Sequence, residues 1–324
     1  MRIVIPGGSG QVGTLLARAL HADGHDVVVL SRRPTRAPWR LVAWDARTVG
    51  EWATELEGAD TVVNLVGRSV NCRYTPANRR EIMDSRLQAT HAIGEAVRGA
   101  ARPPAAWLQM STATIYAHRF DAPNDEATGI LGGHEPDVPD TWRFSIDVAT
   151  RWEAAAAASP LPAGTRLVLL RAAMVMSPDP GGVFDTLLGL ARLGLGGSAA
   201  GGRQYVSWVH ECDFVRAVRW LLAHPEVDGP VNVAAPNPLP YRDFMRQLRE
   251  AAGVPIGLPA TRWMLEVAAL LMRTETELVL KSRRVVPGRL LTAGFTFEQP
   301  EWTAAARELV TRWRNAPAPP PAPR

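Results

Sequence analysis

The chain has 324 residues, of which 46% are hydrophobic and 21% charged, as is typical of a globular protein with a sizeable core. Its net charge is +4, but the basic residues are arginines apart from Lys281, and they are interleaved with acids. Since there is no dense basic run and no nucleic-acid motif, we expect no nucleic-acid partner. No apolar stretch reaches the roughly 18 residues that cross a bilayer, so we expect no membrane partner.

The cysteines point to a reducing compartment. Cys72 and Cys212 lie far apart and lack the spacing of a disulfide framework or a zinc site. The first residues run from a short strand into a glycine loop, which is unlike a signal peptide. We therefore expect a cytoplasmic protein without a metal site.

Apolar runs alternate with helical patterns through the first 235 residues. The predicted strands are continuous apolar runs, typical of strands buried on both faces, at 3–6, 27–30, 41–44, 61–66, 107–111, 167–171 and 231–234. The predicted helices between them are 11–23, 78–99 and 145–158. This alternation predicts an α/β fold with a doubly wound parallel sheet, a Rossmann fold.

The pattern changes near residue 236, where several prolines precede a mainly helical region. Helices are predicted at 241–252, 261–272, 275–284 and 302–314. We therefore expect a cofactor-binding domain over 1–235 and a smaller substrate or lid lobe over 236–314. The last residues, 315–324, are almost all proline and alanine and should form a disordered tail.

A glycine-rich loop follows the first predicted strand and opens the first helix. A tight turn, the close approach of a pyrophosphate and the packing of helix on strand each require glycine. The helix N-terminus also offers backbone N–H groups to phosphates. We predict a dinucleotide site that includes Gly7, Ser9, Gly10, Gln11, Val12 and Gly13.

The second strand ends in Ser31, Arg32 and Arg33, where NAD-preferring sites usually carry an acid. An arginine pair can instead bind a 2′-phosphate through charge-assisted hydrogen bonds, which favours NADP(H). We expect four further residues to lie along the cofactor: Asp45 near the adenine, and the backbone of Leu65, Val66 and Gly67, after the fourth strand, near the ribose.

Four segments together resemble the extended short-chain dehydrogenase/reductases: GGSGQVG at 7–13, NLVG at 64–67, STATIYA at 111–117 and SWVHECD at 207–213. Within that superfamily the chain resembles an atypical group labelled "epimerase family protein", on segments such as DSR at 84–86 and KSRRVVP at 281–287. The resemblance implies an NADP(H) cofactor whose nicotinamide lies near Ser111 and Tyr116.

The chain departs from that superfamily at its Tyr-x-x-x-Lys pair, in which the lysine lowers the tyrosine pKa. Counted back from Trp152, the tyrosine position holds Ser145 and the lysine position holds Ala149. The position of the superfamily's helical asparagine holds Arg86. The usual proton relay is therefore missing.

Other residues are candidates for the chemistry. Ser111 ends the fifth strand, where ligands bind, and could orient a carbonyl. Tyr116 and His118 are possible proton donors, and Asp147 lies near the vacant tyrosine position. Arg86 could bind an acidic substrate or a cofactor phosphate. Each also has a purely structural interpretation, as a strand-end cap, a core aromatic or a solvated surface group.

Two loops and one histidine complete the candidates. The long loop 119–140 and the glycine-rich loop 194–202 are of a kind that often covers a binding site. His210 opens a predicted helix with Glu211 and Asp213 in its first turn, which favours helix capping over metal binding.

Three functions remain open. The first is an NADP(H)-dependent oxidoreductase or epimerase that acts on a small carbonyl or sugar-like substrate. The second is a non-catalytic NADP(H)-binding regulator or redox sensor, and the third is an interaction protein that uses its C-terminal lobe. A homodimer is possible, with the helices at 78–99 and 145–158 as the natural interface.

Overall fold

The computed structural model describes residues 1–271 and 275–316. Its centre is a seven-stranded sheet in the order β10-β6-β5-β4-β1-β2-β3, in which neighbouring strands pair in parallel. The strands are β1 (Arg2–Pro6), β2 (Asp26–Ser31), β3 (Arg40–Ala43), β4 (Thr61–Asn64), β5 (Ala106–Thr112), β6 (Arg166–Ala172) and β10 (Gly229–Val233). The predicted Rossmann-type α/β fold is confirmed.

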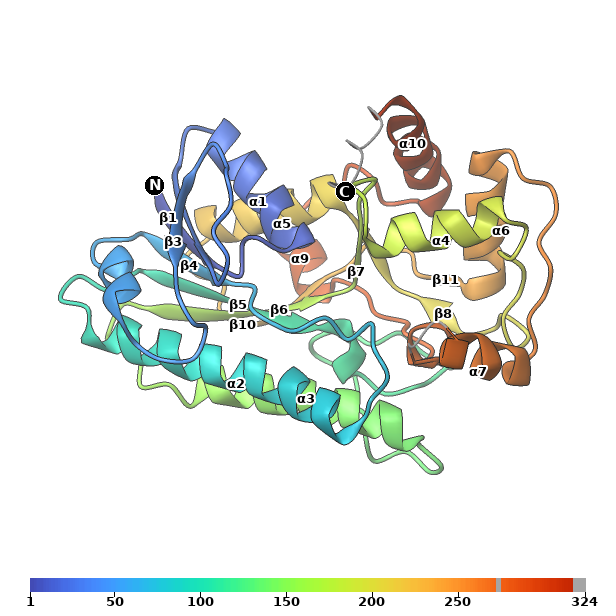
Figure 1. The fold of residues 1–324 in the computed structure, drawn as a ribbon, viewed down its shortest axis with the longest axis horizontal. Helices are drawn as coiled ribbons and strands as arrows, with labels where there is room; N and C mark the ends of the chain where they lie inside the picture. The colour runs from blue at the N-terminus through green and yellow to red at the C-terminus, as the bar shows by residue number, and fades with distance from the viewer. Residues whose placement is uncertain (272–274, 317–324) are drawn as a thin grey trace, which may run out of the picture.

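Helices cover both faces of this sheet (Figure 1). One face carries α1 (Gln11–Ala22), α5 (Glu211–Ala223) and α9 (Gly288–Thr292), and the other carries α2 (Pro76–Gly99) and α3 (Asp140–Ala157). Successive side chains of a strand alternate between the two faces, so Ile3 and Ile5 pack with α1 while Val4 packs with α2. Because both faces are covered, the strands read as unbroken apolar runs.

A second core lies beside the sheet and is built from two separate stretches of chain. The first stretch contributes β7 (Met174–Met176), α4 (Val183–Arg192), β8 (Tyr205–Val206) and β9 (Trp208–His210). The second contributes β11 (Leu239–Pro240), α6 (Tyr241–Ala252) and α10 (Trp302–Asn315). Trp302 joins them, because it stacks on Phe244 with ring centroids 4.1 Å apart and meets Trp208 at 4.9 Å.

The helix predicted at 275–284 is mostly wrong. Only α8 (Glu277–Leu280) is helical, and an extended segment follows it. The backbone N–H of Arg283 donates to the Tyr205 carbonyl at 2.8 Å, and the Ser207 hydroxyl donates to the Arg283 carbonyl at 2.7 Å. These pairings hold the backbone extended, so tertiary contacts override the local helical pattern.

The remaining helical elements are α7 (Arg262–Leu271) and two short 3₁₀ turns, η1 (Glu51–Leu56) and η2 (Ala113–Ile115). The tail predicted to be disordered lies, from residue 317 onward, outside the described residues. Over the described parts of the chain, no helix combines the length and apolar character that a bilayer span requires.

Candidate functional site

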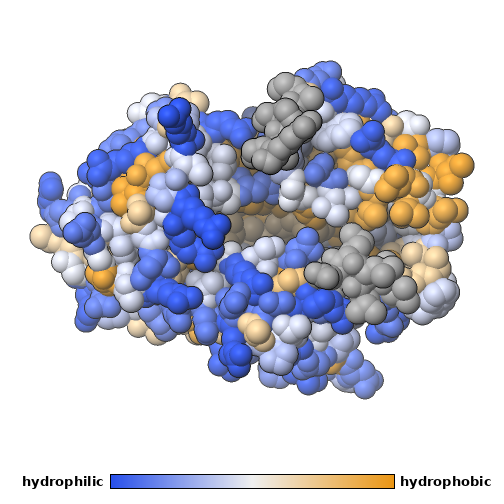
Figure 2. All heavy atoms as spheres, in the orientation of Figure 1, coloured by the Kyte–Doolittle hydropathy of each residue, from blue (hydrophilic) through white to orange (hydrophobic). Residues whose placement is uncertain are grey.

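A cleft of about 440 Å³ opens at the carboxyl ends of β1, β4 and β5. The face drawn in Figure 2 is hollowed between the sheet and the second core. Open α/β sheets bind their ligands at this edge. Its lining includes residues of the glycine loop, the strand ends, the loop before α2, the helices α2 and α3, and the segment around α8: Gly7, Gly10, Gln11, Val12, Gly13, Leu65, Gly67, Tyr74, Arg86, Ser111, Ser145, Glu277 and Arg283.

The glycine loop has the geometry that a phosphate site needs. Gly7 has φ +77°, and a Cβ there would lie 2.9 Å from the Leu65 carbonyl carbon. A Cβ on Gly13 would lie 2.5 Å from the Cα of Gly8. Helix α1 starts after Gly10, whose position has no side-chain cap. The first-turn N–H groups therefore remain available to a ligand at the cleft.

The end of β2 lies beside this loop. The Ser31 hydroxyl donates to the Ser9 hydroxyl at 3.0 Å and accepts from the Arg33 N–H at 3.2 Å. Arg32 and Arg33 are exposed, and within the described residues neither forms an ion pair. Their guanidinium groups are therefore available to an anion.

The other residues predicted along the cofactor divide into two kinds. Asp45 is engaged within its own turn, where it accepts from the Thr48 hydroxyl and from the N–H groups of Thr48 and Arg47, and these bonds lower its pKa. Asp45 does not border the cleft. Leu65 and Gly67 do border it, whereas the Val66 side chain packs into the sheet core.

Ser111 and Tyr116 belong to a buried group of side chains that we call the closed network: Ser111, Tyr116, Glu153, Arg171 and Asn232. The Ser111 hydroxyl donates to Glu153 at 2.6 Å, and Arg171 binds both Glu153 oxygens at 2.9 and 2.8 Å. Tyr116 accepts from Arg171 and donates to Asn232, both at 2.9 Å. The hydroxyl protons of Ser111 and Tyr116 therefore each already have a protein partner.

The closed network changes the expectation for two predicted catalytic residues. Tyr116 is 2% exposed and does not border the cleft, so its hydroxyl cannot donate a proton there. Burial also raises the pKa of Tyr116. Ser111 does border the cleft, but because its single proton goes to Glu153, it can only accept a hydrogen bond from a ligand.

His118 and Asp147 also lie away from the cleft. The His118 Nδ1 accepts from the Ser282 N–H at 2.8 Å, its ring faces a separate hollow, and burial lowers its pKa. Asp147 is 44% exposed and pairs with Arg151 at 2.8 Å. It points outward because two residues of helix turn it about 200° from Ser145.

The structure instead brings together four residues that sequence reasoning did not connect, Tyr74, Ser145, Glu277 and Arg283, which we call the open network. The Tyr74 hydroxyl lies 3.2 Å from the Ser145 hydroxyl, which donates to Glu277. Glu277 pairs with Arg283 at 3.3 Å. All four border the cleft, and Ser145 holds the position of the superfamily's tyrosine.

Burial controls the protonation of the open network. Burial, and then the charge of Glu277, raise the pKa of Tyr74 to about 12, so the phenol is protonated near neutrality. Burial also raises the pKa of Glu277, against the attraction of Arg283. When Glu277 is ionised, Ser145 donates to it and Tyr74 donates to Ser145. When Glu277 is protonated, the chain can reverse, and Tyr74 can donate into the cleft.

Arg86 extends from α2 beneath Gly67 and borders the same cleft. Its Nη1 donates to the carbonyls of Arg68 and Ile82 at 3.1 and 3.0 Å. Its guanidinium lies 4.9 Å from the centre of the Trp152 ring. Burial lowers the pKa of Arg86 to about 10, so the group stays charged at neutral pH.

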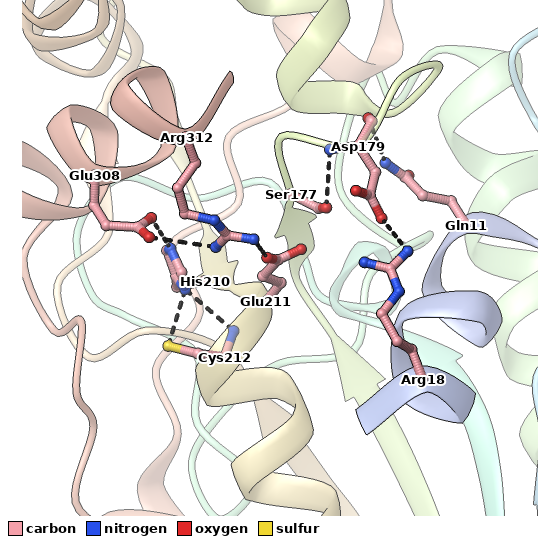
Figure 3. A network of polar contacts seen from close by, with 9 residues as sticks. All are labelled: Gln11, Arg18, Ser177, Asp179, His210, Glu211, Cys212, Glu308 and Arg312. Carbon is pink, nitrogen blue, oxygen red and sulfur yellow. Dashed lines mark hydrogen bonds and ion pairs between the residues drawn. The ribbon is translucent and has the colours of Figure 1, made fainter. Parts of the chain in front are cut away.

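The segment 177–182 is fastened to the start of α1 (Figure 3). The Gln11 amide donates to the Asp179 carbonyl at 3.3 Å, and Arg18 pairs with the Asp179 carboxylate at 3.1 Å. Gly182 lies so close to Gln11 that a Cβ there would come within 1.9 Å of the amide nitrogen. The segment thereby holds the Gln11 side chain at the rim of the cleft.

His210 caps α5, as predicted. Its Nδ1 accepts from the Cys212 N–H at 3.1 Å, and its Nε2 lies 2.9 Å from Glu308 of α10 (Figure 3). Nδ1 is thus an acceptor, so Nε2 carries the proton. In the residues that the structure describes, no group of three or more histidine, cysteine or acidic side chains is arranged to hold a metal ion.

Neither loop proposed as a cover lies over the cleft. In the loop 119–140, the Asn124 N–H donates to the Arg284 carbonyl at 2.6 Å, and Glu126 accepts from the Asn232 N–H at 2.7 Å. In the loop 194–202, the Ala200 N–H donates to the Ala260 carbonyl at 2.9 Å. Both loops are therefore tied to neighbouring segments of the chain.

Comparisons with known proteins agree with this architecture. Residues 3–234 match the NAD dependent epimerase/dehydratase family, and residues 260–309 match a domain of unknown function, DUF1731. The chain is 33% identical over 315 residues to epimerase family protein SDR39U1 of Bos taurus, covering 96% of this chain and all of that protein. It is 26% identical to epimerase family protein YfhF of Bacillus subtilis, covering 96% of this chain and 98% of that one.

A solved structure extends the likeness to three dimensions. The crystal structure of human SDR39U1 (isoform 2) with NADPH superposes with a TM-score of 0.82 at 30% identity, covering 96% of this chain and 99% of the human one. The family match spans most of the chain, and the glycine loop and the strand ends described above lie within it. The chain belongs to the NAD dependent epimerase/dehydratase family.

Proposed function

We propose that the chain is an NADP(H)-dependent oxidoreductase or epimerase that acts on a small carbonyl or sugar-like substrate in this cleft. One observation carries the proposal: an uncapped glycine loop and a protonated tyrosine border the same cleft, with an arginine pair at the neighbouring strand end. The human relative solved with NADPH supports the choice of cofactor.

The residues fit such a dinucleotide. The loop from Gly7 to Gly13, with Ser9, would hold the pyrophosphate, and Ser31, Arg32 and Arg33 the 2′-phosphate. The backbone of 65–67 would lie along the ribose, while Asp45 is the least supported of the predicted contacts because its carboxylate is already engaged. When bound, the nicotinamide donates or accepts a hydride.

The protein must then supply a proton, and Tyr74 takes the role first assigned to Tyr116. Its phenol is protonated near neutrality and reaches the cleft, whereas the hydroxyl of Tyr116 is enclosed. Ser145 and Glu277 position the Tyr74 hydroxyl and can pass a proton to or from it. Ser111 would orient the substrate only by accepting a hydrogen bond from it, because its own proton is donated to Glu153.

Residues 1–235 would bind the cofactor, and the part from 236 to 314 would complete the substrate end of the cleft. Glu277 and Arg283 support this division, because both come from the second part and border the cleft. The second part would then act through fixed contacts, since its segment 281–287 is hydrogen-bonded to β8, to Ser207 and to the loop 119–140.

The test begins with a titration of the purified protein with NADPH and with NADH. We expect tighter binding of NADPH, followed by NADPH oxidation with a member of a panel of aldehydes, ketones and nucleotide sugars. If neither nucleotide binds at millimolar concentration, the proposed function is wrong.

A second candidate is a regulator that binds NADP(H) without turnover. The observation that favours it is the replacement of the superfamily's Tyr and Lys by Ser145 and Ala149 on α3. Tight NADPH binding without turnover of any compound in the panel would support this candidate over the enzyme.

A further inference from the structure

Among the described residues, Arg86 and Arg283 border the cleft and Arg171 lies in the closed network, and only Arg171 and Arg283 have an acid beside them. Arg171 pairs with Glu153 at 2.8 Å, and Arg283 pairs with Glu277 at 3.3 Å. Arg86 forms no ion pair with any acid that the structure describes. Because a buried charge is costly unless a counter-charge lies beside it, Arg86 leaves the cleft with one uncompensated positive charge.

One edge of this guanidinium faces the cleft. Nη1 is used by the carbonyls of Arg68 and Ile82, whereas Nε and Nη2 donate to none of the described residues. These two atoms lie against Gly67, where a Cβ would approach Nη2 to 3.0 Å and Nε to 3.3 Å. Because residue 67 is glycine, no side chain at that position covers the two donors at the cleft wall.

The strand order assigns this cation to the substrate end. The sheet runs β5-β4-β1-β2, with the glycine loop after β1 and Arg32 and Arg33 after β2. The groups suited to the phosphates of the cofactor therefore lie on the β1 and β2 side. Arg86 lies below the end of β4, and its guanidinium lies 4.9 Å from the centre of the ring of Trp152 on α3, the helix that carries Ser145.

We propose that Arg86 binds a carboxylate of the substrate, which makes the substrate a small carbonyl compound bearing an acid group, such as an oxo acid. The carbonyl group of this substrate rests on the proposed function, and its acid group is the new inference. A guanidinium offers two parallel donors that match the two carboxylate oxygens. The contact with Trp152 and the bonds to the two carbonyls hold the fork in one orientation.

The same donors would suit a phosphate of the cofactor, so the experiment separates the two sources of anion. The protein, with and without saturating NADP⁺, is titrated calorimetrically with 4-oxopentanoate and with its neutral match 4-oxopentanamide. A second pair, 2-oxopropanoate and 2-oxopropanamide, covers a shorter chain. We expect the carboxylates to bind about 10-fold or more tightly than the amides, as charge-assisted bonds predict.

Substitutions at Arg86 then test whether this residue causes the preference for carboxylates over amides. In Arg86→Gln the preference for carboxylates should vanish, while the NADPH Kd stays within about 2-fold and the amides bind as before. Arg86→Lys should retain part of the preference, because it keeps the charge and loses the fork. This variant also answers the question if Arg86→Gln does not fold. Arg80→Gln, an exposed residue of the same helix, is the matched control and should change nothing.

Two results would overturn the inference. The first is equal binding of carboxylate and amide by the wild-type protein. The second is a loss of NADPH affinity in Arg86→Gln with the carboxylate preference intact, which would assign the cation to the cofactor. Failure of the proposed function gives a different result, because the wild-type protein would then bind neither dinucleotide. The relative affinity for carboxylates and amides, measured without cofactor, would still test the role of Arg86.

Discussion

The closed and open networks lie near the same edge of the sheet, yet they differ in how many of their members reach the cleft. The closed network joins β5, α3, β6 and β10, and its Tyr116 and Arg171 are 2% and 7% exposed. The open network joins the loop before α2, α3 and the segment around α8, and all its members border the cleft. Tyr116, which the superfamily resemblance placed near the nicotinamide, is thus enclosed, while Tyr74, from a loop outside the superfamily motifs, borders the cleft.

A position in a fold therefore does not fix the role of the side chain that occupies it. Ser111 ends β5, where a catalytic serine is expected, but its proton is held by Glu153. Ser145 stands where the superfamily has a tyrosine, and the phenol beside it comes from Tyr74, on another element. Function has to be argued from the site and not from the fold.

The largest effect we predict breaks the closed network. Glu153→Gln leaves Arg171 as a buried cation without a counter-charge, so the free energy of unfolding should fall by about 3–5 kcal/mol. Denaturation in urea measures the change. Glu81→Gln is the control, because Glu81 pairs with Arg68 at the surface and should lose less than about 1 kcal/mol. A Glu153→Gln protein as stable as the wild type would contradict the structural role.

The next prediction concerns the arginine pair after β2. Changing Arg32 and Arg33 together to alanine should weaken NADPH binding by about 10- to 100-fold and leave NADH binding nearly unchanged, because only NADPH carries the 2′-phosphate. Fluorescence titration with both nucleotides measures the preference. Arg36→Ala, a nearby exposed arginine, serves as the control. Equal losses for both nucleotides would remove the 2′-phosphate assignment.

A third prediction concerns Lys281, which is buried and donates to the Thr114 carbonyl at 2.6 Å. Burial, and then Arg283, lower the pKa of Lys281 to about 7, whereas an unfolded lysine titrates near its ordinary value of about 10.4. Between these values the unfolded chain binds more protons, so this group makes stability rise with pH, by up to about 1.4 kcal/mol per pH unit.

The measurement for Lys281 is the free energy of unfolding at pH 7, 8 and 9 in the wild type and in Lys281→Met. The wild type should gain stability relative to the variant as the pH rises. Parallel curves for the two proteins would show that Lys281 keeps its ordinary pKa in the fold.

The smallest effect concerns the cap of α5. His210→Ala removes the acceptor of the Cys212 N–H and should cost about 1 kcal/mol of stability, as other N-cap losses do. His91→Ala, an exposed residue of α2, should have no measurable effect. NADPH binding should be equal in both variants, and a loss of binding in His210→Ala alone would give the cap a role in the site.

The sequence predicts the fold well because its signals are local. Continuous apolar strands, the glycine loop and the helix that starts at Gln11 follow from backbone and burial requirements within a few residues. The 275–284 segment shows where such reasoning fails. Its helical pattern is overridden by hydrogen bonds to Tyr205 and Ser207, which are distant in the sequence.

The site is predicted only where it is built locally. Gly7, Gly10 and Gly67 reach the cleft because each follows a strand. Tyr74 lies in an irregular loop, and its contact with Glu277 through Ser145 spans residues far apart in the chain, so no spacing rule could reveal it. The absence of lysine near Ser145 was the one signal in the sequence for the displaced proton donor that we propose.

The most direct test of that displacement compares Tyr74→Phe with Tyr116→Phe in one set of assays, using NADPH oxidation with the carbonyl compound that reacts fastest. Tyr74→Phe should lower turnover about 100-fold or more with NADPH affinity unchanged. Tyr116→Phe should keep turnover and lose about 1–2 kcal/mol of stability, because its partners Arg171 and Asn232 are buried. The reverse pattern, with turnover lost in Tyr116→Phe and kept in Tyr74→Phe, would contradict this account.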